Sequence, residues 1–195
     1  ADFRNFHSFD FTAHSPGARL SRRLADNLNL SLGYGFTRRR YRREINRLGE
    51  DGELVRLDER QVDRLHRLDA SLGYTGGMLL NFTWSLVRND SNNYGFSYWN
   101  NRFTLLFSDR LPAGVYLNAY LFFEIKRYSD PVDRPLLVDI LTEENDNNGA
   151  VLKFSRPLTA ALEANFTLSA YRNESSVREL NFRKNVAALS LTTRF

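Results

Sequence analysis

The sequence contains no cysteine, and it has only one methionine and three histidines among its 195 residues. Without cysteine the fold has no disulfide bonds and no thiolate chemistry, and the composition does not tie it to a reducing compartment. No run of 18 apolar residues occurs, which excludes a transmembrane helix. The formal net charge of +4 is too small to imply a nucleic-acid partner by itself.

Aromatic residues are what the sequence has in excess, with fifteen Phe, nine Tyr and two Trp. Aromatic and β-branched residues favour strands, and the Ala/Leu/Glu/Lys background of a helical protein is missing. We therefore expect an all-β fold. A mean hydropathy of -0.46 does not exclude a membrane, because strands of a membrane barrel turn only alternate residues toward lipid.

Apolar and polar residues alternate with a period of two through most of the chain. Clear examples are the segments 28–37, 67–75, 80–87, 115–126, 162–171 and 187–195. The apolar side of these segments is Leu, Phe, Ala and Val, whereas the other side is mainly Asn, Ser, Gly, Thr and Tyr. A soluble β-barrel would place dispersed Lys, Glu and Arg on that second side, while small polar residues suit a hydrated lumen. The pattern predicts a transmembrane antiparallel up-and-down β-barrel.

The connections between these segments alternate between two kinds. Tight turns are expected at 24–27, 75–77, 111–114 and 156–159, and long polar loops at about 44–62, 88–94 and 129–148. Short turns at one end of the strands and long loops at the other describe a repeating hairpin. We expect a single domain that spans residues 1–195.

The number of strands is odd in the simplest assignment. The nine expected segments are about 6–23, 28–43, 63–75, 78–90, 95–110, 115–128, 148–156, 160–174 and 179–195. Single-chain bacterial barrels have even strand numbers. Splitting the first segment at 14–17 would give ten strands, and merging 63–90 differently would give eight. A chain that forms the C-terminal part of a larger barrel would need neither change, because strands outside it would complete the even number. The sequence leaves all three open.

Alternating loop lengths, aromatic residues near strand ends and the terminal stretch VAALSLTTRF together resemble the Gram-negative outer-membrane β-barrel superfamily. In that superfamily the last strand commonly ends in Phe, which the barrel-insertion machinery reads. Phe195, Leu191 and Leu189 match this pattern, and Thr193 departs from it mildly. The resemblance implies the bacterial outer membrane as location. It also implies the lipid bilayer, lipopolysaccharide and the insertion machinery as partners, with further strands or subunits as an open alternative.

Several charged residues fall on the side of the strands expected to face the lumen. They are Arg67, Asp69, Arg102, Glu124, Lys126, Lys153, Glu163 and Arg183. In a narrow barrel these groups would form a salt-bridge network that blocks the interior. In a wide barrel they would line a water-filled path and set its ion selectivity.

The stretch RRRYRR holds the densest positive charge. The favoured interpretation is a solvated strand end above the membrane. The alternative is a cationic collar at the outer end of the strand, formed by Arg38, Arg39, Arg40, Arg42 and Arg43, that binds lipopolysaccharide phosphates or attracts anionic solutes, since guanidinium groups pair bidentately with phosphate. No nucleic-acid partner is expected, because the arginine run lacks companions elsewhere in the sequence and no RNP-like motif occurs.

Neither catalysis nor a metal or cofactor is expected. Ser8, His14 and Asp10 can be combined on paper, but nothing in the sequence sets their geometry, and no H-E-x-x-H spacing occurs. The acidic loop 129–148 lacks the spacing of a known calcium loop, and it would act as a constriction, a docking loop or a solvated loop.

Two main functions remain from the sequence. The first is a non-enzymatic pore or translocation conduit. The second is a small plugged barrel that acts as an anchor, adhesin or scaffold through its extracellular loops. A lipid-modifying barrel enzyme is a weaker third hypothesis.

Overall fold

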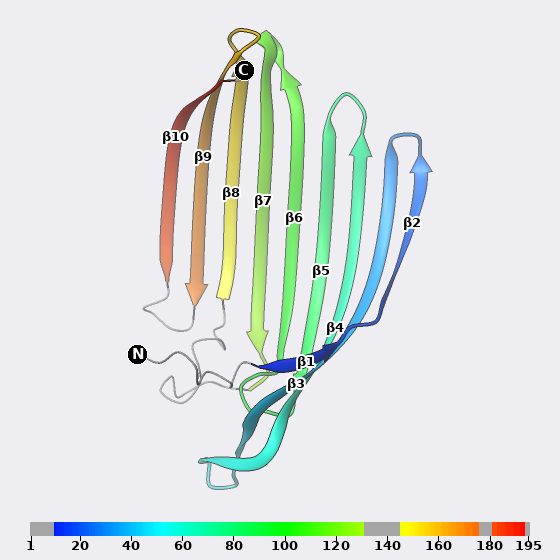
Figure 1. Ribbon diagram of the computed structural model, residues 1–195, viewed down its shortest axis with the longest axis vertical. Coiled ribbons are helices and arrows are strands. Elements are labelled where there is room, and N and C mark those ends of the chain that lie inside the picture. The colour runs from blue at the N-terminus through cyan, green and yellow to red at the C-terminus, as the bar shows by residue number, and fades with distance from the viewer. Residues whose placement is uncertain (1–9, 131–144, 176–180, 194–195) are drawn as a thin grey trace.

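The computed structural model describes residues 10–130, 145–175 and 181–193 and is all-β over them (Figure 1). The strands are β1 (Phe11–His14), β2 (Gly17–Ala25), β3 (Leu28–Leu48), β4 (Leu54–Thr75), β5 (Leu79–Ser91), β6 (Tyr98–Leu111), β7 (Val115–Tyr128), β8 (Asn145–Pro157), β9 (Leu162–Ser175) and β10 (Phe182–Thr193). A single 3-10 turn, η3 (Pro112–Gly114), links β6 to β7. Over these described ranges, no helix has the length and hydropathy needed to cross a membrane.

All ten strands belong to one antiparallel sheet, in which strands that follow one another in the chain lie side by side from β3 to β10. The predicted all-β, up-and-down antiparallel fold is therefore confirmed. The expected closure into a barrel is not formed by the described residues, where β10 pairs only with β9 and both β1 and β2 pair only with β3. Figure 1 shows β2 and β10 at opposite sides of the sheet.

The first strand segment is interrupted rather than folded into a hairpin. β1 and β2 both pair with β3, at Arg38–Tyr41 and at Leu28–Gly35, so they form one broken edge strand. The break falls at Ser15–Pro16, because proline has no N–H to donate to the ladder. Across the sheet there are nine strand positions, as the nine expected segments predicted, and the split at 14–17 adds no further crossing.

β3 and β4 extend well beyond the other strands. They contain 21 and 22 residues, against 12–14 residues in β5 to β10. The expected loop 44–62 is therefore mostly a paired hairpin, with only 49–53 as its turn, and Figure 1 shows it projecting past the end of the sheet. The pairing shifts register between Arg40 and Glu44, which marks a β-bulge where the extension begins.

The sheet is a single layer with two chemically different faces, since opposed residues on antiparallel neighbours share a face. We call them the apolar face and the polar face. A typical row of the apolar face is Leu72, Phe82, Leu105 and Leu121. A typical row of the polar face is Asp69, Ser85, Arg102 and Glu124.

Burial on the two faces is the reverse of that in a water-soluble protein. Large side chains of the apolar face are exposed, with Phe82 at 41%, Phe123 at 44% and Phe166 at 41%. Of the described side chains, Ile45 is the only buried hydrophobic one. The buried polar side chains are Gln61, Asp63, Asn89, Asn93, Ser155, Asn165 and Asn173. The sheet therefore has no apolar core of the kind that stabilises a soluble domain.

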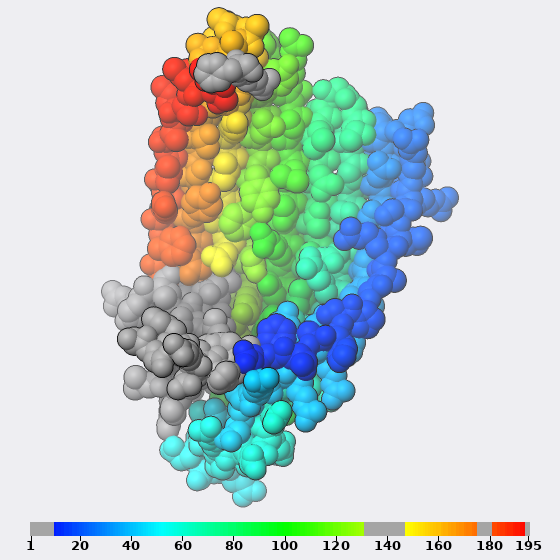
Figure 2. Space-filling view, in the orientation of Figure 1, coloured from blue at the N-terminus to red at the C-terminus, as the bar shows by residue number. Residues whose placement is uncertain are grey.

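The sheet is bowed into a trough, with its edge strands curving toward the viewer and its middle strands recessed (Figure 2). Side chains converge on the concave side of a bowed sheet and are less exposed there. The buried groups Ser155 and Asn165 lie on the polar face, so we infer that this face lines the trough. Hydrogen bonds such as Ser155 Oγ to Asn165 Oδ1 (2.7 Å) and Asn165 Nδ2 to Thr192 Oγ1 (3.1 Å) tie its strands together.

Candidate functional site

Charged side chains on β4 to β7 form two linked groups on the polar face. Arg67 Nε donates to both carboxylate oxygens of Asp69, at 3.0 and 2.9 Å, and Ser85 Oγ donates to the same carboxylate. Glu124 accepts a hydrogen bond from Asn100 Nδ2 at 2.6 Å and lies 3.7 Å from Arg102 Nη1. The structure thus brings together four of the predicted lumen residues as two ion pairs.

The two partners of each ion pair differ in exposure. The Asp69 and Glu124 side chains are 19% and 18% exposed, whereas Arg67 and Arg102 are 60% and 45% exposed. The acids lie against the sheet, and the guanidinium groups reach into the trough. Solutes in the trough therefore meet positive charge first, which favours anions.

Three of the four remaining predicted lumen residues share this face. By strand register, Lys126 lies opposite Asn100, Lys153 opposite Asn118 and Thr167, and Glu163 opposite Thr192, and all of these positions belong to the polar face. Lys153 is exposed there.

Arg183 is a correction to the predicted set. By strand register, Arg183 lies opposite Arg172, and Arg172 lies opposite Asn148. Asn148 in turn lies opposite Phe123, which belongs to the apolar face. The position of Arg183 has the same parity as Ala187 and Leu189, so strand alternation places it on the outer side.

The arginine run 38–43 does not form a single collar. Arg38 and Arg40 lie on the side of the apolar face, opposite Arg64 and Val62, while Arg39 lies on the side of the polar face, opposite Asp63. Strand alternation thus divides the run between the two sides of β3, and the five arginines do not form the single collar considered as the alternative to a solvated strand end.

Each of three arginines in the run has its own partner. Arg42 Nη1 lies 3.5 Å from an Asp10 carboxylate oxygen. Arg39 stacks over the Phe11 ring at 5.4 Å, and Arg43 over the Phe96 ring at 4.3 Å. These contacts hold the arginines at the base of the projecting hairpin.

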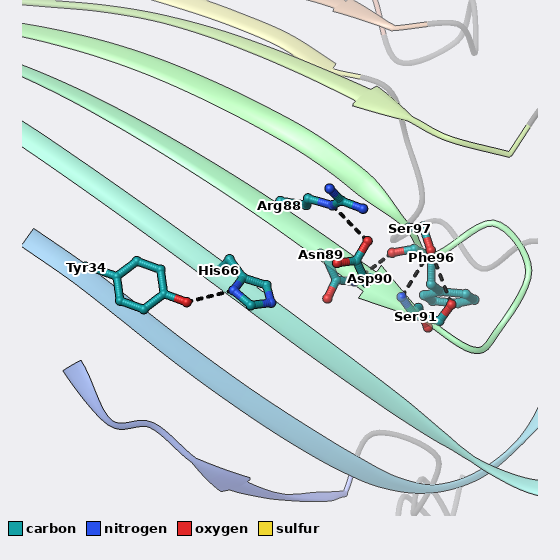
Figure 3. Close-up of polar contacts among 8 residues, drawn as sticks. All are labelled: Tyr34, His66, Arg88, Asn89, Asp90, Ser91, Phe96 and Ser97. Carbon is teal, nitrogen blue, oxygen red and sulfur yellow. Dashed lines mark hydrogen bonds and ion pairs between the residues drawn. The ribbon is translucent and has the colours of Figure 1, made fainter.

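A row of basic residues borders the apolar face at the end nearer the long loops. His66, Arg88, Trp99 and Arg127 lie opposite one another on β4 to β7. Arg88 lies 4.9 Å from the Trp99 ring and 2.9 Å from Asp90 Oδ1, and the Tyr34 hydroxyl bonds His66 Nδ1 at 2.8 Å (Figure 3). The predicted anion contacts did not include Arg64, Arg88 or Arg127. The alternation of apolar and polar residues at 64–68 and 84–88 could have identified Arg64 and Arg88.

A buried polar cluster lies where the projecting hairpin meets the sheet. The Gln61 side chain is fully buried and accepts hydrogen bonds from Arg43 Nε (2.5 Å) and Asn93 Nδ2 (2.8 Å), while its own Nε2 donates to Asp63 (2.8 Å). Burial raises the pKa of the nearby Tyr41 hydroxyl, and the negative charge of Asp63 raises it further. Sequence reasoning did not find this cluster.

The β5–β6 loop supplies Asn93 to this cluster and is held by several hydrogen bonds. Asn89 Nδ2 donates to the Phe96 carbonyl at 2.7 Å, and the Ser91 amide donates to Ser97 Oγ at 3.0 Å (Figure 3). Asn93 Oδ1 accepts from the Asn46 amide at 2.8 Å. The loop therefore folds back toward Asn46 and Gln61 at the base of the projecting hairpin.

The part of the chain that the structure describes contains two histidines, His14 and His66. His14 lies opposite Arg38, and His66 is bonded to Tyr34 beside the Phe36 ring at 5.1 Å. No three His, Asp or Glu side chains of the described ranges are close enough to hold a metal ion. Ser8, His7, Phe195 and the acidic stretch 131–144 lie outside the described residues.

Comparisons with known proteins add no family to this description. No family model matches the chain, and no curated protein and no solved structure matches it.

Proposed function

We propose that the full-length protein is an outer-membrane β-barrel that forms a water-filled pore, and that this chain supplies part of its wall. The reversed burial of the two faces is the observation that carries the proposal. A face of exposed Leu and Phe is favourable against hydrocarbon, and a concave face of Asn, Ser and Arg is favourable against water.

Strand length supports the same conclusion. The strands β5 to β10 contain 12–14 residues, and a tilted strand needs roughly 9–11 residues to cross a bilayer. The basic row at one border of the apolar face fits the level of phosphate headgroups. We extend the proposal to lipopolysaccharide as the lipid on this side and to Phe195 as the insertion signal, as the resemblance implies.

Strand direction constrains how the barrel closes. Eight antiparallel pairings separate β2 from β10, so the two edge strands run in the same direction. A direct β2–β10 contact would be parallel. Antiparallel closure therefore requires an odd number of further strands from outside the described residues, which brings the nine positions to an even total.

A second copy of this chain does not meet that requirement. If two copies stood in the membrane in the same orientation, β10 of one would lie beside β2 of the other, and each seam would again be parallel. The proposal predicts no disulfide between Leu20→Cys and Ala187→Cys, either within one full-length molecule or between two. The 195 residues contain no native cysteine, so within them only the two introduced thiols can pair, and a disulfide in either form would overturn the closure argument.

Planar-bilayer recording of the purified full-length protein tests the pore itself. We expect steady ionic current with a preference for anions, because Arg67 and Arg102 reach into the trough. A folded, membrane-inserted protein that carries no current would contradict the pore.

The buried cluster around Gln61 and the inward fold of residues 92–97 favour a second candidate, a barrel blocked at one end that works through its projecting hairpin. Silence in the bilayer recording would support this anchor or scaffold. Current that appears only after the loop residues 92–97 are shortened would also support it.

A further inference from the structure

Aromatic and cationic side chains form a line along the polar face of the β6–β7 hairpin. We call this line the ring–cation track. Its rings are Tyr98, Tyr116, Tyr120, Phe122 and Tyr128, and its cations are Arg102, Arg110 and Lys126. The polar face of β3 and β4, which lie beyond β5, instead carries small residues such as Ser31, Gly33 and Ser71.

Arg102 is the centre of the track. Its guanidinium carbon lies 5.4 Å from the Phe122 ring centroid, and its Nη2 donates to the Tyr120 hydroxyl at 3.2 Å. The Tyr120 and Phe122 rings are themselves 5.7 Å apart. Glu124 lies 3.7 Å from Arg102 Nη1, but the Arg102 side chain is 45% exposed against 18% for Glu124, so an anion in the trough can reach the guanidinium while a flat group contacts the rings.

The two ends of the track repeat this combination. Lys126 Nζ lies 4.4 Å from the Tyr98 ring and 4.6 Å from the Tyr128 ring at the end nearer the long loops. Arg110 lies 5.8 Å from the Tyr116 ring at the opposite end, and that ring is 40% exposed.

Gly149 explains how the Phe122 ring lies low in the trough. A Cβ at this position would meet the Phe122 ring at 2.4 Å and the Tyr171 ring at 3.0 Å. The Phe122 ring therefore leans onto β8, in the space that a side chain at position 149 would occupy. This arrangement widens the track toward Tyr171 without raising a bulky group into the path.

The track is long compared with a small solute. Tyr116 and Tyr128 are twelve residues apart on one strand, which corresponds to about 40 Å at the usual rise of a strand. Between them, hydrogen-bonding groups alternate with the rings, including Asn118, whose Oδ1 accepts from Ser108 Oγ at 2.8 Å. A ligand that uses the whole line must be extended, must carry repeated negative charge, and must offer flat faces together with hydroxyl groups.

We propose that the ring–cation track binds an extended anionic polysaccharide and guides it through the trough. The inference rests on the proposed pore, whose substrate class it names. Sugar rings present flat C–H faces to aromatic side chains, their carboxylate or sulfate groups pair with arginine and lysine, and their hydroxyl groups bond to Asn and Ser.

Binding in detergent micelles tests this inference without requiring conduction. The probe is a linear galacturonic acid oligomer, titrated calorimetrically into the full-length protein beside a neutral linear glucose oligomer of the same length. We expect the acidic oligomer to bind at least about tenfold more tightly. Equal affinity for the neutral oligomer, or tighter binding of a single-stranded oligothymidylate of equal charge, would overturn the proposal.

Matched variants on the two faces of the same hairpin locate the binding. Phe122→Leu and Arg102→Gln should each weaken binding by about tenfold. Phe123→Leu and Arg127→Gln lie on the apolar side of β7 and should change it by less than about twofold. Equal losses from both pairs would contradict a role for the track, and so would no loss from either variant in the track.

The two proposals fail in distinguishable ways. Absence of current together with selective binding of the acidic oligomer would overturn the pore proposal and retain the ring–cation track as a binding surface. Steady current together with no selective binding of the acidic oligomer in micelles would retain the pore and overturn the polysaccharide proposal.

Discussion

Phe122 and Phe123 are neighbours on β7, yet they lie in opposite environments. Phe122 leans against Gly149 among Arg102 and Tyr120 on the polar face, while Phe123 is 44% exposed in a row with Phe103 at a ring distance of 6.4 Å. The comparison extends to the two whole faces. Phenylalanine occurs on both, so the surrounding residues, and not the residue type, distinguish the two faces.

The largest expected effect comes from placing a charge on the apolar face. Phe82→Arg should destabilise the membrane-inserted protein by about 2–4 kcal/mol, because a guanidinium in hydrocarbon loses its hydration. The neighbouring Thr83→Arg, which faces the trough, should cost less than about 1 kcal/mol. Guanidinium unfolding in phospholipid vesicles measures both, and equal costs would erase the distinction between the faces.

The buried cluster at the base of the hairpin should give the next largest effect. Gln61→Leu leaves Arg43, Asp63 and Asn93 without their shared partner in a buried site, which should cost about 1–3 kcal/mol. The exposed neighbour Glu59→Ala is the matched control and should stay within about 0.5 kcal/mol. The same unfolding assay measures both variants. No loss of stability in Gln61→Leu would mean that water replaces these contacts.

Removing an acid from the trough should change selectivity more than stability. Asp69→Asn deprives the exposed Arg67 of its carboxylate, and an exposed pair contributes at most about 1 kcal/mol. The reversal potential in a salt gradient should shift toward stronger anion preference. A shift toward cations would show that Arg67 does not face the conducting path.

The smallest effect is expected on the projecting hairpin. Arg56 pairs with Glu44, but the Arg56 side chain is 75% exposed. Arg56→Gln should therefore change stability by about 0.5 kcal/mol or less, and added salt should reduce the difference. A larger loss in the unfolding assay would indicate that the hairpin is packed against another part of the full-length protein.

Strand alternation predicted most of the sheet because it reports local side-chain direction. The set Leu80, Phe82, Trp84 and Leu86 shares the apolar face as expected. The same rule contained the signal that separates Arg38 and Arg40 from Arg39, and Arg183 from the lumen set. The collar alternative and the lumen position of Arg183 do not fit the structure because charge was grouped along the sequence rather than by alternate positions.

Other features could not be predicted from local pattern. Residues 44–48 and 54–60 pair through their backbones, so their polar side chains gave no indication of a strand. The Gln61 cluster depends on Asn93, which is 32 residues away and arrives on a folded loop. Closure of the sheet depends on the relative direction of its two edge strands. That direction follows from the antiparallel pairings across all nine strand positions and is known only once those pairings are known.

Among the described residues, the outer edges of β2 and β10 have no strand partner, and under the proposed outer-membrane function this constrains the order of assembly. Hydrocarbon offers no partner for the N–H and C=O groups along such edges, and each group left unsatisfied there costs several kcal/mol. A barrel built on this sheet would therefore pair both edges with further strands before or during entry into the bilayer, and we infer that formation of this last strand contact would be the step that commits the molecule to the membrane.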